Sequence, residues 1–315
     1  MVTARGGGQP LVGIVGPTGV GKTDLALEVA RLHPDCEIVS VDSMTVYREF
    51  TVGTAKPSSE ELGGLPYHLI DVASITEEFS LGRFIELFNL TLMDLEQRGK
   101  HAVLVGGTSL YLRSALDGMQ PPPRYNGLRQ WLEQLDVGGE QTASLFRILK
   151  SHDHGAARIV DPTNSRRVIR ALEVSLGSSG CASVSGSELH AYPEIPTVLV
   201  GLFPGWEALA TRIDGRIDRQ LSSGWLEEVT HIIEQRYIIS RTASQAIGYL
   251  ELSAVVAGVM DLEEAVSVIK RRTRKLARRQ LAWLRRDPRI VWSESAQEGR
   301  EVIERELSRI QDRAS

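Results

Sequence analysis

The chain has 315 residues, of which 42% are hydrophobic, and its 29 glycines bring the apolar share to about half, as in ordinary globular proteins. This composition excludes a disordered or collagen-like protein, and the length predicts two domains or one core with a large insertion. The formal net charge is only −4, and the two cysteines, Cys36 and Cys181, have no partners at metal-ligand spacing. Neither a zinc site nor a disulfide framework is therefore indicated, and a reduced, cytoplasmic setting is expected.

The first apolar run, residues 11–16, is too short for an export signal or a membrane helix, so we expect a soluble protein without membrane contact. Similar short, nearly unbroken runs occur at 37–42, 68–72, 102–107 and 197–203. Helical patterns such as 24–32 and 83–95 separate them. The alternation predicts an α/β protein with a doubly wound parallel sheet.

A glycine-rich loop follows the first predicted strand. Residues 16–23 match the pattern G-x-x-x-x-G-K-[ST] and precede a predicted helix. In such a loop backbone N–H groups face phosphate oxygens, the lysine reaches the terminal phosphates, and the last hydroxyl ligates Mg²⁺. The sequence therefore predicts a phosphate site, with Thr23 as the metal ligand, formed by Gly16, Pro17, Thr18, Gly19, Val20, Gly21, Lys22 and Thr23.

A carboxylate, Asp42, follows the second predicted strand, at the edge of a parallel sheet where ligands bind. We expect Asp42 to face the anion in the loop; the alternative is a helix N-cap, for which Asp-Ser is also suited. The strand at 102–105 ends in Gly106, Gly107 and Thr108, without a carboxylate. Nucleotide hydrolases place an acid there to hold Mg²⁺ through water, so its lack weakens the case for ATP hydrolysis.

The sequence changes in character between the strands at 102–107 and 197–203. Residues 118–194 lack strand-like runs and carry short helical patterns at 128–135 and 164–176. They also contain a Gly/Ser-rich segment, 177–187, which we interpret as a mobile loop. We predict a helical insertion domain at 118–194, within a core formed by 1–117 and 195–315 whose C-terminal part is helical.

The predicted helix at 206–221 has an apolar stripe with arginines on one flank and aspartates on the other. The arginines can reach a diphosphate from this flank, and surface ion pairing is the alternative. The stripe consists of Trp206, Leu209, Ile213, Ile217 and Leu221; the flanking residues are Arg212, Arg216 and Arg219, and Asp214 and Asp218.

Residues 270–289 contain ten basic residues and one acid, a charge of +9, which leaves −13 for the other 295 residues. A basic element on an acidic protein indicates an anionic polymer as partner, with a solvated helix face as the alternative. The segment is amphipathic, so one side can dock on the core while the other follows phosphates. The docking side has Val266, Ile269, Thr273, Leu276, Ala277, Gln280 and Leu284, and the basic side has Arg271, Arg274, Lys275, Arg278 and Arg279.

Six segments occur in order between residues 11 and 292: GPTGVGKTDLA, VSVDSMTVYREFTVGTAKPS, YHLIDV, LVGGTSLYL, DPTNSRRVIRALEV and RRQLAWLRRDPR. Together they resemble the tRNA dimethylallyltransferases, also called tRNA isopentenyltransferases, over nearly the whole chain. The resemblance implies a P-loop NTPase-like parallel sheet core with a helical insertion domain and a helical C-terminus. It also implies transfer of a dimethylallyl group from dimethylallyl diphosphate to N6 of adenosine 37, beside the tRNA anticodon, with release of diphosphate.

In that family the loop holds the diphosphate of the prenyl donor and not a nucleotide, which accounts for the missing second carboxylate. The resemblance implies that Asp42 positions the adenine amine and accepts its proton, and that Thr108 lies close to the reacting nucleotide. It implies that Arg216 helps to bind the leaving group. Mg²⁺ at Thr23 is the expected cofactor, and a monomer is the expected state.

The resemblance also implies contacts with the anticodon stem-loop of tRNA. Because the target adenine is stacked in that loop, it must be flipped out; Tyr47, Tyr111 and Trp283 are candidates to stack on loop bases, or else to pack in the core. The tRNA contacts expected beside Asp42 and Thr108 are Ser43, Met44, Thr45, Arg166, Arg167, Arg170, Gln245, Gly248, Tyr249, Arg278, Arg279, Gln280, Trp283 and Arg285.

Three positions depart from the family pattern. Thr45 stands where many relatives have Gln, Leu250 stands where a basic residue is common, and 177–187 replaces a more ordered motif.

Two other functions share part of the pattern. An ATP-dependent small-molecule kinase shares the loop and Asp42 but does not predict the basic element, and a non-catalytic RNA-binding module predicts RNA affinity without prenyl transfer.

Overall fold

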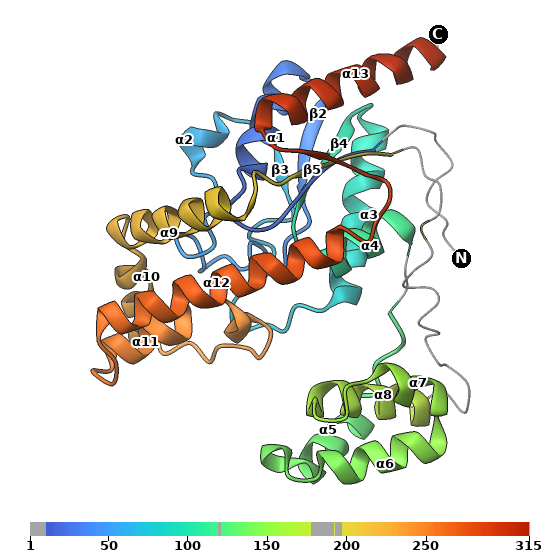
Figure 1. Ribbon diagram of the computed structural model, residues 1–315, viewed down its shortest axis with the longest axis vertical. Helices are drawn as coiled ribbons and strands as arrows, with labels where there is room; N and C mark the ends of the chain where they lie inside the picture. The colour runs from blue at the N-terminus through green and yellow to red at the C-terminus, as the bar shows by residue number, and fades with distance from the viewer. Residues whose placement is uncertain (1–10, 119–120, 178–191, 193–196, 315) are drawn as a thin grey trace. The chain divides into compact units, whose positions relative to one another are not determined.

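The computed structural model describes residues 11–118, 121–177, 192 and 197–314 (Figure 1). The chain forms two compact units, which we call the core unit (Met1–Met119 with Glu194–Ser315) and the insertion unit (Gln120–Pro193). These bounds lie within two residues of those predicted at 117/118 and 194/195. None of the described helices is long and apolar enough to cross a membrane.

The core unit is built on a six-stranded parallel sheet, as the sequence predicts. Its strand order is β3-β2-β4-β1-β5-β6, so β1 lies between β4 and β5 in the middle of the sheet. Helices cover the sheet, which explains why its strands are almost continuously apolar. The strands are β1 (Leu11–Val15), β2 (Cys36–Ser40), β3 (Tyr67–His68), β4 (His101–Gly106), β5 (Thr197–Leu202) and β6 (Ile290–Ser293).

Two details of the strand prediction are wrong. The strand expected at 68–72 ends at His68, because Leu69 and Asp71 adopt left-handed backbone conformations with φ of 61° and 57°. The edge strand β6 lies in a region that we expect to be helical. Its four residues are too few to show a period of their own, and pairing with β5 fixes their conformation.

The connections β1 to β2 and β3 to β4 run in opposite directions along the sheet. Right-handed crossovers therefore place α1 and α3 on opposite faces. Figure 1 shows α9 and α12 beside one another, separate from these covering helices. The helices of the core unit are α1 (Lys22–Leu32), α2 (Ser59–Leu62), α3 (Leu81–Gln97), α4 (Ser109–Asp117), α9 (Trp206–Ser222), α10 (Trp225–Glu234), α11 (Tyr249–Val256), α12 (Leu262–Leu284) and α13 (Ala296–Ala314).

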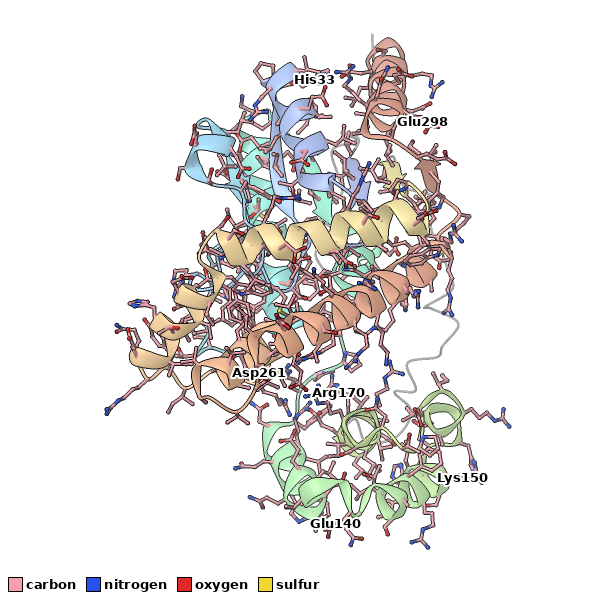
Figure 2. All side chains as sticks on the ribbon, turned by 60° about the vertical axis from the view of Figure 1, so that its left-hand side comes forward. His33, Glu140, Lys150, Arg170, Asp261 and Glu298 are labelled. Atoms are coloured by element: carbon pink, nitrogen blue, oxygen red, sulfur yellow. The ribbon has the colours of Figure 1, made fainter. Side chains whose placement is uncertain are left out.

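Helices α9 and α12 are joined by ion pairs as well as by apolar packing. Asp214 of α9 accepts two hydrogen bonds from Arg274 at 3.0 and 2.6 Å, and Asp218 lies 2.6 Å from Lys270. Figure 2 shows α12 running from Asp261 alongside α9. The acidic flank predicted for the helix at 206–221 therefore pairs with Lys270 and Arg274 of the basic element. Fewer basic side chains of α12 are then free to bind an anionic partner.

The insertion unit has a small core of its own and is helical, as expected. Leu132, Leu149 and Leu172 are buried in that core. The buried Glu173 accepts a hydrogen bond from the Tyr125 N–H at 2.9 Å and so ties α8 to the start of α5. The helices are α5 (Asn126–Leu135), α6 (Thr142–His152), α7 (His154–Ile159) and α8 (Ser165–Gly177), with a 3-10 turn at Val137–Gly139. The predicted mobile loop at 177–187 lies outside the described residues after Gly177.

Candidate active site

The glycine-rich loop lies between β1 and α1, in the context that the sequence predicts. Gly21 precedes α1 with φ of 92°, and Gly19 has φ of 86°, so both positions favour glycine. A Cβ on Gly19 would lie 2.9 Å from the Ile213 side chain of α9. The loop is therefore packed tightly against the helix that carries the three arginines.

A cavity of about 460 Å³ opens at this loop. The loop forms one wall, residues 55–57 form another, and the arginine flank of α9 forms a third. None of the ion pairs among the described residues involves these arginines, so the alternative of surface ion pairing is wrong for them. The lining residues are Gly19, Val20, Gly21, Lys22, Thr23, Asp24, Leu27, Ala55, Lys56, Pro57, Glu61, Arg212, Arg216 and Arg219.

Two cations of the cavity are held by the protein itself. Arg216 donates to the Thr18 hydroxyl at 3.2 Å and to the Thr54 carbonyl at 3.5 Å. Burial lowers the pKa of Arg216, and Asp42 acts in the opposite direction. Lys22 Nζ donates to the Pro17 carbonyl at 2.8 Å, and burial lowers its pKa to about 8. An anion entering the cavity relieves this unfavourable burial of positive charge.

Asp42 lies two residues beyond the end of β2. Its Oδ1 accepts a hydrogen bond from the Met44 N–H at 2.8 Å, which closes an Asx turn. The described backbone that follows forms turns and no helix, so the alternative of a helix N-cap is wrong. Thr108, at the end of β4, accepts from the Ser43 N–H at 3.2 Å. The structure thus joins the two strand ends on which the sequence analysis places Asp42 and Thr108.

Tyr67 of β3 is a site residue that the sequence analysis missed. Burial raises its pKa, and the nearby Asp42 adds to the effect, while hydrogen bonding with Ser40 and Thr23 acts in the opposite direction. The hydroxyl of Ser40 lies 2.9 Å from that of Thr45. Thr45 is therefore turned toward the end of β2, close to Tyr67.

Residues 51–53, just before the wall at 55–57, are held from α9 and α10. Glu228 accepts hydrogen bonds from the N–H groups of Thr51, Val52 and Gly53 at 2.9, 2.7 and 3.3 Å. Gln220 donates to the carbonyls of Val52 and Gly53 at 2.6 and 3.0 Å. Sequence reasoning missed this clamp, since neither side chain belongs to a phosphate-binding pattern.

The clamp also explains two residues expected to contact RNA. Tyr249 is only 4% exposed, and its hydroxyl donates to Glu228 at 2.7 Å, so its ring is packed inside the core unit and the expected contact with RNA stays a prediction. Gly248 is buried against the Trp225 ring. Both residues pack beside the segment that the clamp holds, residues 51–53.

Gln280 of α12 reaches the loop from the other side. Its Oε1 accepts a hydrogen bond from the Thr18 N–H at 2.9 Å, and a Cβ on Gly107 would lie 2.7 Å from its Nε2. The Gln280 side chain, an expected tRNA contact, is therefore already bound to the phosphate loop. It couples the basic helix to the loop directly.

The remaining expected RNA contacts differ in exposure. Tyr47 and Tyr111 are 0% and 6% exposed, so they pack in the core. In the insertion unit Arg170 donates to the carbonyls of Pro122 and Pro123 at 2.7 and 3.1 Å, and Figure 2 shows it on α8. Three of the expected contacts are partly exposed: Ser43, Met44 and Trp283. The exposed ones are Gln245, Arg278, Arg279 and Arg285 in the core unit and Arg166 and Arg167 in the insertion unit.

The basic face of α12 also needs one correction. Arg274 is expected on the phosphate-facing side, but it pairs with Asp214. Arg272, similarly, pairs with Glu251 of α11. Arg271, Lys275 and Arg279 remain exposed on the helix.

Comparison with known proteins decides the family. A family model described as IPP transferase matches residues 45–287, which is more than half of the chain. The chain belongs to the tRNA dimethylallyltransferase family. A tRNA dimethylallyltransferase of Desulforudis audaxviator is 40% identical over 285 residues, covering 90% of this chain and 91% of the relative. The enzyme named tRNA dimethylallyltransferase 2 of Syntrophus aciditrophicus is 37% identical over 292 residues, covering 91% and 93%.

Solved structures of the family share the fold. The full-length tRNA isopentenylpyrophosphate transferase of Bacillus halodurans superposes with a TM-score of 0.68 at 32% identity, covering 96% of this chain and 98% of that one. A eukaryotic dimethylallyltransferase acting on tRNA gives a TM-score of 0.73 at 26% identity, covering 90% and 74%. The expected P-loop-like α/β fold and membership of this prenyltransferase family are both confirmed.

Proposed function

We propose that the protein transfers a dimethylallyl group from dimethylallyl diphosphate to N6 of adenosine 37 in tRNA and releases diphosphate. The observation that carries the proposal is the cation-lined cavity at the phosphate loop, with Asp42 and Thr108 joined at the neighbouring strand ends. In support, the charge of Asp42 acts on Lys22 and Arg216 of the cavity, and β4 is followed by Gly107 and Thr108 without a carboxylate. A diphosphate donor and a proton acceptor are what a prenyl transfer requires.

The cavity binds the diphosphate of the donor. Lys22, Arg216 and the N–H groups of the loop are preorganised around it, and they stabilise the charge that develops as the C1–O bond of the donor breaks. The electron pair of that bond leaves with the diphosphate. Arg212 and Arg219, which line the same cavity, add positive charge at its mouth.

Asp42 acts on the acceptor. The adenine amine is a weak nucleophile, so a carboxylate within hydrogen-bonding reach orients it and takes its proton as the N6–C1 bond forms. The Asx turn leaves Asp42 Oδ2 for this task, since Oδ1 accepts from Met44. Thr108 holds the turn in place through Ser43.

The residues fit a magnesium ion of the P-loop type. No cluster of three or more acidic, His or Cys side chains that could hold a metal occurs among the described residues. Mg²⁺ is commonly held by one or two protein oxygens together with substrate phosphates and water, and the Thr23 hydroxyl lines the cavity at the start of α1. When bound, the ion neutralises charge on the leaving diphosphate.

The protein acts as a monomer in the cytoplasm, and one chain binds one tRNA. The exposed Arg278, Arg279 and Arg285 on the core unit and Arg166 and Arg167 on the insertion unit supply cations for its phosphates. The anticodon loop supplies the target base because its nucleotides are the easiest to unstack. The kinase alternative has no support, since the relatives are named as prenyltransferases.

The test is incubation of the protein and Mg²⁺ with labelled dimethylallyl diphosphate and a tRNA that carries adenosine at position 37. Label in the RNA is expected, and a tRNA with guanosine at that position stays unlabelled. In binding assays dimethylallyl diphosphate should bind at least about tenfold tighter than ATP, a difference of about 1.4 kcal/mol. Tight ATP binding with phosphoryl transfer to a small acceptor and no label in the tRNA overturns the proposal.

A further inference from the structure

Trp206, the first residue of α9, does not complete the buried stripe that the sequence predicts. Its side chain is 39% exposed, whereas Leu209, Ile213 and Ile217 of the same stripe are 0%, 1% and 2% exposed. Single exposed apolar side chains are common on folded proteins, so the groups around the ring decide whether it belongs to a binding surface.

Cations and aromatic rings alternate around Trp206. The Arg278 guanidinium lies 5.5 Å from the centroid of the Trp206 ring, and the Arg285 guanidinium lies 5.1 Å from the centroid of the Phe203 ring. The two rings meet edge to face, with centroids 5.4 Å apart. Stacking of this kind fixes both arginines of α12 against the loop between β5 and α9.

A second cavity, of about 720 Å³, opens beside the ring. It is lined by residues 204–208, which include Trp206, and by Thr211 and Arg212. Arg212 also lines the cavity at the phosphate loop, and its Nη1 donates to the Val20 carbonyl at 3.3 Å. The two cavities therefore share one cationic side chain, and the ring borders the site already described.

We propose that Trp206 is a stacking platform for an unpaired base of the RNA substrate. The inference rests on the proposed function for the identity of the RNA. Single-stranded nucleic acid is recognised by aromatic faces next to cations, because every base has a π-face and every nucleotide carries a phosphate. Arg212, Arg278 and Arg285 supply the cations, against the single carboxylate of Glu207 in the lining of the cavity.

The test measures binding of an anticodon stem-loop RNA over a range of salt concentrations for Trp206→Ala, Trp206→Phe and Arg278→Ala. Trp206→Ala should weaken binding by about tenfold with an unchanged slope of log affinity against log salt, because stacking releases no counterions. Trp206→Phe should retain most of the affinity, because a ring remains. Arg278→Ala should flatten the slope by about 0.7, the value of one phosphate contact in a single strand.

Two controls separate stacking from folding and from the proposed function. Val259→Ala removes an apolar side chain that is 80% exposed and lies outside the lining of both cavities, and it should leave RNA affinity unchanged. Affinity for inorganic pyrophosphate should be equal in all variants. Wild-type affinity for RNA in Trp206→Ala, or an equal loss in Trp206→Ala and Trp206→Phe, overturns the platform. A tRNA that is bound but never prenylated overturns the proposed function alone.

Discussion

The role of Asp42 depends on one local turn. The carboxylate uses one oxygen to accept from Met44 and so fixes the direction of its own side chain, while Thr108 holds the next residue. The position of Asp42 at a strand end could be predicted from the sequence, because a parallel sheet brings all such ends to one edge. The turn itself could not, since Asp-Ser suits a helix cap equally well.

Replacing Asp42 by Asn separates chemistry from structure. The amide oxygen of Asn still accepts from Met44, so the turn, the thermal stability and the pyrophosphate affinity should persist. An amide accepts no proton at neutral pH, so the single-turnover rate of prenyl transfer should fall by about 10² to 10⁴-fold. Rapid quench with labelled donor gives the rate, and near-normal turnover in this variant would remove Asp42 from the chemistry.

A second carboxylate, Glu37, contributes to stability and not to the site. It is buried in β2, and hydrogen bonds from Arg98 and His68 lower its pKa to about 2 from 4.5, against the effect of burial. Because the folded pKa is the lower one, this stabilisation is full above about pH 4.5 and is lost as the pH falls toward about 2.

Glu37→Gln should therefore lower the free energy of unfolding at pH 7 by about 1.5 to 3 kcal/mol, the range for hydrogen bonds to charged groups. The gap between the two proteins should narrow as the pH falls below about 4.5. Urea unfolding at several pH values measures it. Asp94→Asn, which removes the exposed partner of Arg98, is the control and should change stability little. A gap that stays constant down to pH 3 would contradict the ion pair.

At the level of elements, one clamp connects α9 and α10 to residues 51–54, which lead into the wall of the phosphate cavity at 55–57. Glu228 of α10 and Gln220 of α9 hold residues 51–53, and the next residue, Thr54, accepts from Arg216. The contacts join residues about 170 positions apart in the chain. Periodicity within a segment carries no information on such pairs, which is why the helices could be predicted and the clamp could not.

Glu228→Gln tests whether the clamp positions the wall. The new NH₂ group faces backbone N–H donors, so the loop should loosen and pyrophosphate affinity should fall by about tenfold. Affinity for the stem-loop RNA should change little. Glu234→Gln, at the exposed end of the same helix, is the matched control and should behave as the wild type. Isothermal titration measures both ligands; equal losses for pyrophosphate and RNA would indicate a general effect on folding instead.

At the level of the whole molecule, the charge count predicted that the partner is negatively charged. It overstated the number of basic side chains on α12 that are free to bind that partner. Three basic residues of α12 are bound within the core unit: Lys270 pairs with Asp218, Arg272 with Glu251 and Arg274 with Asp214. The acidic flank of α9 was visible in the sequence, yet its partner was not. A count of charges gives no pairing, because pairing is decided by how the helices pack.

The salt dependence of RNA binding therefore separates bound cations from free ones. Replacing the exposed Arg271, Lys275 and Arg279 by Ala should flatten the slope of log affinity against log salt by about 2, since each phosphate contact of a single strand contributes about 0.7. Arg274→Ala should leave the slope unchanged and lower the free energy of unfolding by about 0.2 to 1 kcal/mol, because it breaks a half-exposed ion pair. Pyrophosphate affinity should be unchanged in both. Titrations at three or more salt concentrations provide the slopes. If Arg274→Ala flattens the slope and the triple variant does not, then the pairing with Asp214 is exchanged for phosphate when RNA binds, and the free face of α12 lies elsewhere.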